Sequence, residues 1–130
     1  MLVVAPTREL ACQSYDVIKE YASTLSLNAS VVYGGVPKWK QVNELNKGVD
    51  IVVGTPGRLK DLVMEESCIL SGVTQLVLDE ADRMLGEIFF KLLLLEYSVR
   101  FVFVMLSISL NCYFRMFSIR TIHYQLLFYS

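Results

Sequence analysis

Four short apolar runs recur along the first part of the chain, and each is nearly continuous instead of alternating with polar residues. They span residues 2–5, 29–33, 50–54 and 75–79 and are rich in β-branched side chains. Runs of this kind are typical of strands that are buried on both faces, as in a parallel sheet. The hydrophobic pattern therefore predicts four central strands.

Segments of helical length separate these runs. Residues 8–25 contain helix formers with apolar side chains at helical spacing, and residues 57–66 place Leu59, Leu62 and Val63 on one face. Residues 37–47 begin with a proline and are followed by Gly48, the asymmetry expected of a helix. Strands that alternate with helices predict an α/β fold, a parallel sheet with flanking helices and right-handed crossovers.

Glycine-containing or polar segments follow each predicted strand: "PTREL" from Pro6, "GGVPK" from Gly34, "TPGRL" from Thr55 and "DEADRML" from Asp79. In a parallel sheet all four junctions lie at the carboxyl edge, where ligands bind in open α/β folds. Each junction opens a helix, whose free N–H groups favour a phosphate. Glycines let a ligand approach the backbone closely. We therefore expect a phosphate-bearing ligand along this edge.

Each motif alone also has a purely structural explanation. Thr7 followed by Glu9 is typical of a helix cap, the paired glycines are typical of a turn, and residues 55–58 are typical of a helix start. The four motifs occur at four successive strand ends. That recurrence favours a shared ligand over four independent structural roles.

The acidic junction has its own candidate chemistry. Asp79 ends an apolar run, where a carboxylate can hold Mg²⁺ through the metal's water shell. Glu80 can then orient a water molecule for attack on a γ-phosphate. The alternative is that Asp79 caps the following helix, with Asp82 favourable in its first turn.

The motifs, in this order and spacing, resemble those of the DEAD-box ATP-dependent RNA helicases. "PTREL", "GG", "TPGR" and "VLDEAD" all fall within residues 1–85, which are similar to part of the first RecA-like domain of these enzymes. The sequence between the motifs looks most like that of the nuclear and nucleolar DEAD-box helicases that act in ribosome assembly or RNA processing. The resemblance therefore implies a nuclear or nucleolar location.

The resemblance also implies a role for each motif residue. Asp79 and Glu80 would be catalytic in ATP hydrolysis with Mg²⁺, with Asp79 holding the metal through water, and Asp82 would couple the nucleotide state to RNA binding. Contacts of this family to the RNA backbone do not read sequence, so RNA is the expected partner without DNA-specific readout. The expected RNA-binding residues are Pro6, Thr7, Arg8, Glu9, Gly34, Gly35, Thr55, Pro56, Gly57 and Arg58.

Composition changes the picture after Leu85. Residues 1–85 hold eight Lys or Arg and eleven Asp or Glu, a net charge of −3, whereas residues 86–130 hold four and two, a net charge of +2. All seven Phe follow Leu85 and all three Pro precede it. We therefore expect a partial RecA-like domain at residues 1–85 and a divergent hydrophobic tail at 86–130, helical or poorly ordered.

Several origins of the tail stay open. Residues 101–109 could form the next strand of the family's sheet, but we favour a tail translated from non-coding sequence or a damaged gene model. The longest uncharged run of the tail, residues 101–114, is fourteen residues long. That is shorter than the roughly 20 residues of a spanning helix, so a membrane partner is disfavoured. Three widely spaced cysteines without a C-x-x-C pair indicate reduced, intracellular thiols.

The phosphate-cradling string G-x-x-x-x-G-K-[ST] does not occur in these 130 residues. The sequence therefore predicts a fragment of an ATP-dependent RNA helicase that is inactive alone, with ATP and Mg²⁺ as cofactors of the parent family. One alternative is a non-enzymatic product that binds RNA or partners weakly. Another is a membrane-associated or misfolded remnant.

Overall fold

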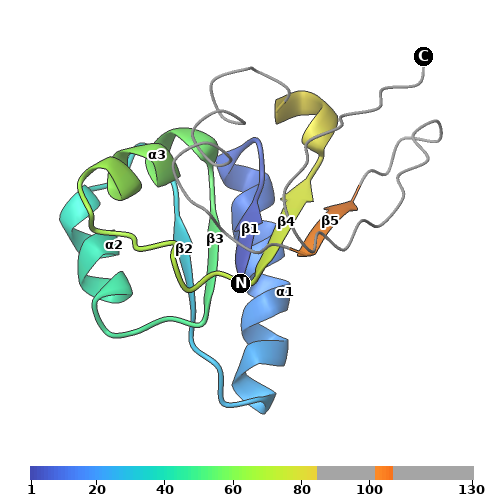
Figure 1. Ribbon diagram of the computed structural model, residues 1–130, viewed down its shortest axis with the longest axis horizontal. Coiled ribbons are helices and arrows are strands. Elements are labelled where there is room, and N and C mark those ends of the chain that lie inside the picture. The colour runs from blue at the N-terminus through green and yellow to red at the C-terminus, as the bar shows by residue number, and fades with distance from the viewer. Residues whose placement is uncertain (85–101, 107–130) are drawn as a thin grey trace.

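The computed structural model describes residues 1–84 and 102–106 and has a five-stranded sheet at its centre (Figure 1). The order in the sheet is β2-β3-β1-β4-β5, and every neighbouring pair is parallel. The predicted α/β fold with a parallel sheet is thereby confirmed. The strands are β1 (Leu2–Val4), β2 (Ala29–Val32), β3 (Ile51–Gly54), β4 (Gln75–Asp79) and β5 (Val102–Leu106).

Three α-helices and one short 3-10 helix connect the first four strands and follow the fourth. They are α1 (Arg8–Thr24), α2 (Lys38–Leu45), α3 (Pro56–Met64) and η1 (Ala81–Met84). Their bounds differ from the predicted ones by at most two residues. The helix α2 ends earlier than predicted because Lys47 and Gly48 donate to carbonyls only three residues back, which tightens the last turn.

The helices cover both faces of the sheet because the chain changes direction across it. The connection from β1 to β2 crosses the sheet one way, and the connections through α2 and α3 return the other way. Right-handed crossovers then place α1 on one face and α2 and α3 on the opposite face (Figure 1). The result is a three-layer arrangement.

Alternate residues of the strands supply the two halves of the core. Leu2 and Val4 of β1 pack with Leu59 and Leu62 of α3, whereas Val3 packs on the α1 side. Gly54 lies where α3 crosses β3, and a Cβ there would lie 2.6 Å from Val32 Cγ2. Real side chains do not approach so closely, so packing requires a glycine at this position.

The strand β5 lies within the range that the sequence allowed for an additional strand. Gln75 is opposite Val102 and Asp79 is opposite Leu106, so β5 extends the sheet beyond β4. The remaining tail, residues 85–101 and 107–130, lies outside the described residues, and the division at Leu85 stays a prediction. Within the described part, the structure contains no helix that is both long and apolar enough to cross a membrane.

Two cysteines lie in the described part, and neither is in a disulfide. Cys12 is half-buried, whereas Cys68 is packed in the core beneath α3. Burial raises the pKa of the Cys68 thiol above its usual range, because desolvation disfavours the thiolate. Since the thiolate is the reactive form, Cys68 is a structural residue rather than a candidate nucleophile.

Leu62 offers a test of the core on the α3 side. Its side chain is fully buried, and Leu62→Ala should lower the free energy of unfolding by about 2–5 kcal/mol. Leu25→Ala is the matched control, because Leu25 is 68% exposed and its truncation should cost less than about 0.5 kcal/mol. Urea unfolding followed by circular dichroism measures both. Equal losses in the two variants would contradict the packing described.

Candidate functional site

Strand register brings the predicted site segments to one edge of the sheet. Gly54 of β3 is opposite both Val4 of β1 and Val32 of β2, and Val4 is also opposite Leu78 of β4. The segments after these residues therefore lie side by side. We call the edge of the sheet where they lie the carboxyl edge. In spatial order they are residues 34–35, residues 55–58, residues 6–9 and residues 79–80.

The segment after β1 presents a cation at this edge. Thr7 caps α1 by accepting a hydrogen bond from the Leu10 N–H at 3.3 Å, as the structural interpretation predicted. Arg8 and Glu9 are exposed in the first turn, and Pro6 is half-buried. The Arg8 guanidinium lies over the Tyr33 ring, 4.7 Å from its centroid. The ring holds the exposed guanidinium in place at the edge.

The glycines at the edge leave open space. Gly35 has a φ of +80°, which favours glycine, but Gly34 and Gly57 have no such angle. A Cβ on Gly34, Gly35 or Gly57 would meet no atom within 4 Å. The packing of this chain therefore requires Gly54 but explains neither Gly34 nor Gly57. Open space above an exposed backbone is what the close approach of a ligand needs.

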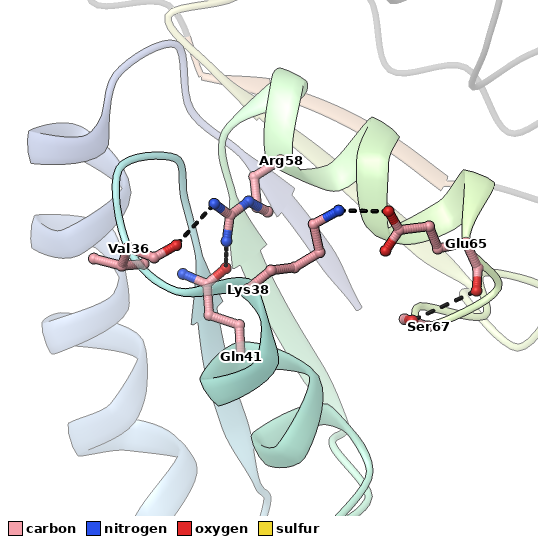
Figure 2. Close-up of polar contacts among 6 residues, drawn as sticks. All are labelled: Val36, Lys38, Gln41, Arg58, Glu65 and Ser67. Carbon is pink, nitrogen blue, oxygen red and sulfur yellow. Dashed lines mark hydrogen bonds and ion pairs between the residues drawn. The ribbon is translucent and has the colours of Figure 1, made fainter.

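Arg58 has a different environment from Arg8. Figure 2 shows its guanidinium pointing between two segments: Nη1 donates to Gln41 Oε1 at 2.7 Å and Nη2 donates to the Val36 carbonyl at 3.0 Å. Gln41, only 7% exposed, donates in turn from Nε2 to the Tyr33 carbonyl at 3.1 Å. These bonds tie the start of α3 to both sides of the loop that carries Gly34 and Gly35.

The sequence pattern did not single out Gln41, although a signal was present. Gln41 lies four residues before Leu45, on the buried face of α2. A polar side chain at such a position must find hydrogen-bond partners. Lys38 adds a second link between α2 and α3, because its Nζ lies 2.5 Å from Glu65 Oε1 (Figure 2). Thr55, the N-cap residue of α3, makes no side-chain capping bond, and Pro56 occupies the first turn.

The acidic segment begins with a carboxylate that a neighbouring helix orients. Ser14 of α1 donates from Oγ to Asp79 Oδ2 at 3.2 Å, and Asp79 is half-buried. Sequence reasoning missed Ser14, because the contact joins residues 65 positions apart. Asp82 lies in η1, so the backbone places it in the first turn after Glu80, as predicted.

Glu80 has an unusual backbone and side chain. Its φ is +48°, in the left-handed region that non-glycine residues avoid. Its Oε2 is buried, and Arg83 Nη1 lies 3.0 Å away. The two groups do not align as a hydrogen bond, so Oε2 has no such partner within the described residues. Strained residues with unsatisfied buried atoms concentrate at functional sites.

The donor set suits one kind of metal binding only. No group of three His, Cys, Asp or Glu side chains gathers in the part of the chain that the structure describes. A magnesium ion held by one or two carboxylates, its own water and substrate phosphates does not need such a cage. Asp79, half-buried and oriented by Ser14, fits this outer-sphere arrangement.

Replacing Glu80 tests whether the fold needs it. Glu80→Gly should raise the free energy of unfolding by about 0.5–1 kcal/mol, because glycine relieves a left-handed angle that costs about 1–2 kcal/mol. The matched control is Glu66→Gly, at an exposed residue with a φ of 56°. Chemical denaturation of both variants is the measurement. A loss of stability in Glu80→Gly alone would mean that the carboxylate supports the fold.

Comparison with known proteins agrees with this geometry. The sequence model of the DEAD/DEAH box helicase family matches residues 1–107. The match passes Leu85, where the sequence alone indicated that the likeness ends, and it includes β5.

Three relatives are named as RNA helicases. ATP-dependent RNA helicase DBP3 of Yarrowia lipolytica is 59% identical over 87 residues, which are 67% of this chain and 16% of that protein. DEAD-box ATP-dependent RNA helicase 20 of Arabidopsis thaliana is 52% identical over 65% of this chain and 17% of its own length. DEAD-box ATP-dependent RNA helicase 5 of the same plant is 48% identical over 78% of this chain and 18% of its own length. The chain thus spans less than a fifth of these curated relatives.

Solved structures show the same likeness. The yeast DEAD-box splicing factor Prp28 has a TM-score of 0.71 and 31% identity over 80% of this chain and 26% of its own. A hypothetical ATP-dependent RNA helicase from Sulfolobus tokodaii has a TM-score of 0.65 and 35% identity. The match covers 79% of this chain and 33% of that protein. The family model, the relatives and the sheet with its motif-bearing edge agree, and the chain belongs to the DEAD/DEAH box helicase family.

Proposed function

We propose that this chain is the part of an ATP-dependent RNA helicase that grips the RNA backbone and carries the acidic residues for ATP hydrolysis. The observation that carries the proposal is the carboxyl edge, where three motif-bearing loops, two of them with open glycines, lie next to an oriented carboxylate. Relatives named as ATP-dependent RNA helicases support this chemistry.

RNA would lie across the loops after β2, β3 and β1, which are neighbours in the sheet. Arg8, exposed and held by Tyr33, would contact one phosphate, and the backbone at Gly34 and Gly57 would approach others closely. Arg58 would act by holding the glycine loop, because each of its terminal nitrogens already donates a hydrogen bond to that part of the chain. The net charge of −3 on residues 1–85 fits a few local contacts rather than a broad basic face.

The remaining RNA contacts would come from the motif residues around these groups. Thr55 has a side chain without a capping bond, which leaves its hydroxyl for a phosphate oxygen. Pro6, Thr7 and Glu9 would shape the helix start beside Arg8, and Gly35 and Pro56 would shape the two neighbouring loops. Since none of these groups reads a base edge, binding would be independent of RNA sequence.

The acidic residues would serve the nucleotide. Bound Mg²⁺ would neutralise the phosphates of ATP, and Asp79 would hold the metal through its water shell. Glu80 would orient the attacking water, for which its unsatisfied buried oxygen is suited. Asp82, one residue beyond Ala81 in η1, would couple nucleotide state to RNA binding. Nuclear or nucleolar location stays a prediction.

We further propose that these 130 residues bind RNA without turning over ATP. Clamping of the phosphates is usually the largest catalytic contribution, and the phosphate-cradling string does not occur in this sequence. The competing candidate is a non-enzymatic product that shares the same edge for RNA. In the helicase from which this part would come, Asp79 and Glu80 would act on a nucleotide, whereas in the competing candidate they would have no such role.

Gly57→Ala tests whether Gly57 faces a ligand or serves only the fold. Because a Cβ there meets no atom and alanine favours a helix, stability should rise by about 0.5–1 kcal/mol. Affinity for single-stranded RNA should nevertheless fall about tenfold, because the added Cβ would keep a phosphate from approaching the backbone. A tenfold loss corresponds to one charge-assisted hydrogen bond. Fluorescence anisotropy of a labelled RNA measures the affinity.

Gly72→Ala is the matched control for this experiment. Gly72 also has open space and no left-handed angle, but it precedes β4 and so lies at the opposite edge of the sheet. Its RNA affinity should equal that of the unmodified chain. Unchanged affinity in Gly57→Ala, or an equal loss in both variants, would count against RNA at the carboxyl edge.

ATP titrations test the nucleotide part of the proposal. RNA affinity should be the same with and without Mg²⁺ and ATP, and phosphate release should not exceed that of an Asp79→Asn variant. Phosphate release and anisotropy measure the two quantities. Tight Mg²⁺-dependent ATP binding by the unmodified chain would contradict the expected inactivity, without affecting the assignment of the RNA-binding edge.

A further inference from the structure

Trp39 is an exposed aromatic side chain that neither the fold nor the motifs explain. It is the only tryptophan of the chain and is 62% exposed. Gln41 and Leu45 form the buried face of α2, and a rotation of about 100° per residue places Trp39 on the outward side of the helix. An indole combines a large apolar surface with a polar N–H group, which is why tryptophan is enriched at interfaces.

The fold places Trp39 beside the carboxyl edge. It lies four residues after Gly35, in the first turn of α2, which starts at that edge. The Cα–Cβ bonds of a helix tilt toward its N-terminus, and the N-terminus of α2 follows the glycine loop. Since β2 is the terminal strand on this side, Trp39 lies at the outer end of the row of loops.

The surroundings of Trp39 suit a nucleic-acid ligand. Lys40 Nζ lies 5.5 Å from the centroid of the indole ring, so a cation accompanies the aromatic surface. Among the other exposed apolar residues, Val17 and Tyr21 are on α1, across the sheet from α2, and Met64 ends α3 on the face that α2 shares. An aromatic ring with a neighbouring cation is typical of single-strand binding.

We propose that Trp39 stacks on an unpaired base at the end of an RNA strand bound along the carboxyl edge. This inference rests on the proposed RNA-binding function and adds a base contact to an edge that otherwise meets only the backbone. Stacking uses the π-face that every base has, so the contact selects single-stranded RNA without reading sequence.

The indole itself reports the contact, because no other tryptophan contributes to the emission of the full chain. Unlabelled single-stranded RNA of on the order of ten nucleotides should quench Trp39 fluorescence with the same midpoint that anisotropy gives for a labelled copy. An abasic oligomer of equal length and charge should bind more weakly and leave the emission unchanged. A blunt RNA duplex, which offers no unpaired base, should also leave it unchanged.

Substitutions give an independent readout. Trp39→Ala should weaken binding of single-stranded RNA about tenfold and leave binding of the abasic oligomer unchanged. Trp39→Tyr, which keeps a ring, should restore most of the affinity. Thermal unfolding of both variants should match the unmodified chain, because the side chain is largely exposed.

The outcomes separate this inference from the proposed function. RNA binding with unchanged Trp39 emission and unchanged affinity in Trp39→Ala would overturn the stacking contact and leave the RNA-binding edge intact. Equal quenching by the abasic oligomer or the duplex would overturn it as well. Absence of RNA binding by anisotropy would overturn the proposed function, and the stacking contact with it.

Discussion

The parallel register around Gly54 is the constraint on which the site depends. Gly54 is level with Val4 on one side and Val32 on the other, and Val4 is level with Leu78. A slip of one residue would turn every β3 side chain to the opposite face of the sheet. The close contact of α3 with Gly54 opposes such a slip, because Leu59 fits only where a Cβ is missing. The loops meet at one edge as a consequence of this packing.

The sequence predicted the elements of the fold well because its local signals were strong. Continuous β-branched runs identified four strands, and Gly48 marked the end of α2 to within a few residues. Contacts that join distant positions left weaker signals. Nothing near Ser14 indicated that it would meet Asp79, and the TPGR motif alone did not show that Arg58 turns inward to Gln41. The motif pattern thus predicted which segments meet at the carboxyl edge, but it could not assign each side chain a direction.

The fold constrains some residues at the carboxyl edge and not others. Gly54 and Gly35 are required by packing and by backbone angle, respectively, whereas Gly57 is required by neither. Glu80 holds a backbone angle that a glycine would hold more easily. A chain selected for stability alone would favour different residues at positions 57 and 80. Their presence is therefore better explained by a ligand than by folding.

The two arginines of the edge would have different roles in the proposed RNA binding. Arg58 donates to Gln41 and to the Val36 carbonyl and so holds the glycine loop in one shape, whereas Arg8 keeps an exposed guanidinium stacked on Tyr33. A loop fixed in advance loses less conformational entropy when RNA binds. With few cations at the edge, the affinity for RNA in the proposed function would come from such preorganisation rather than from total charge, and a grip built from few phosphate contacts would depend weakly on salt.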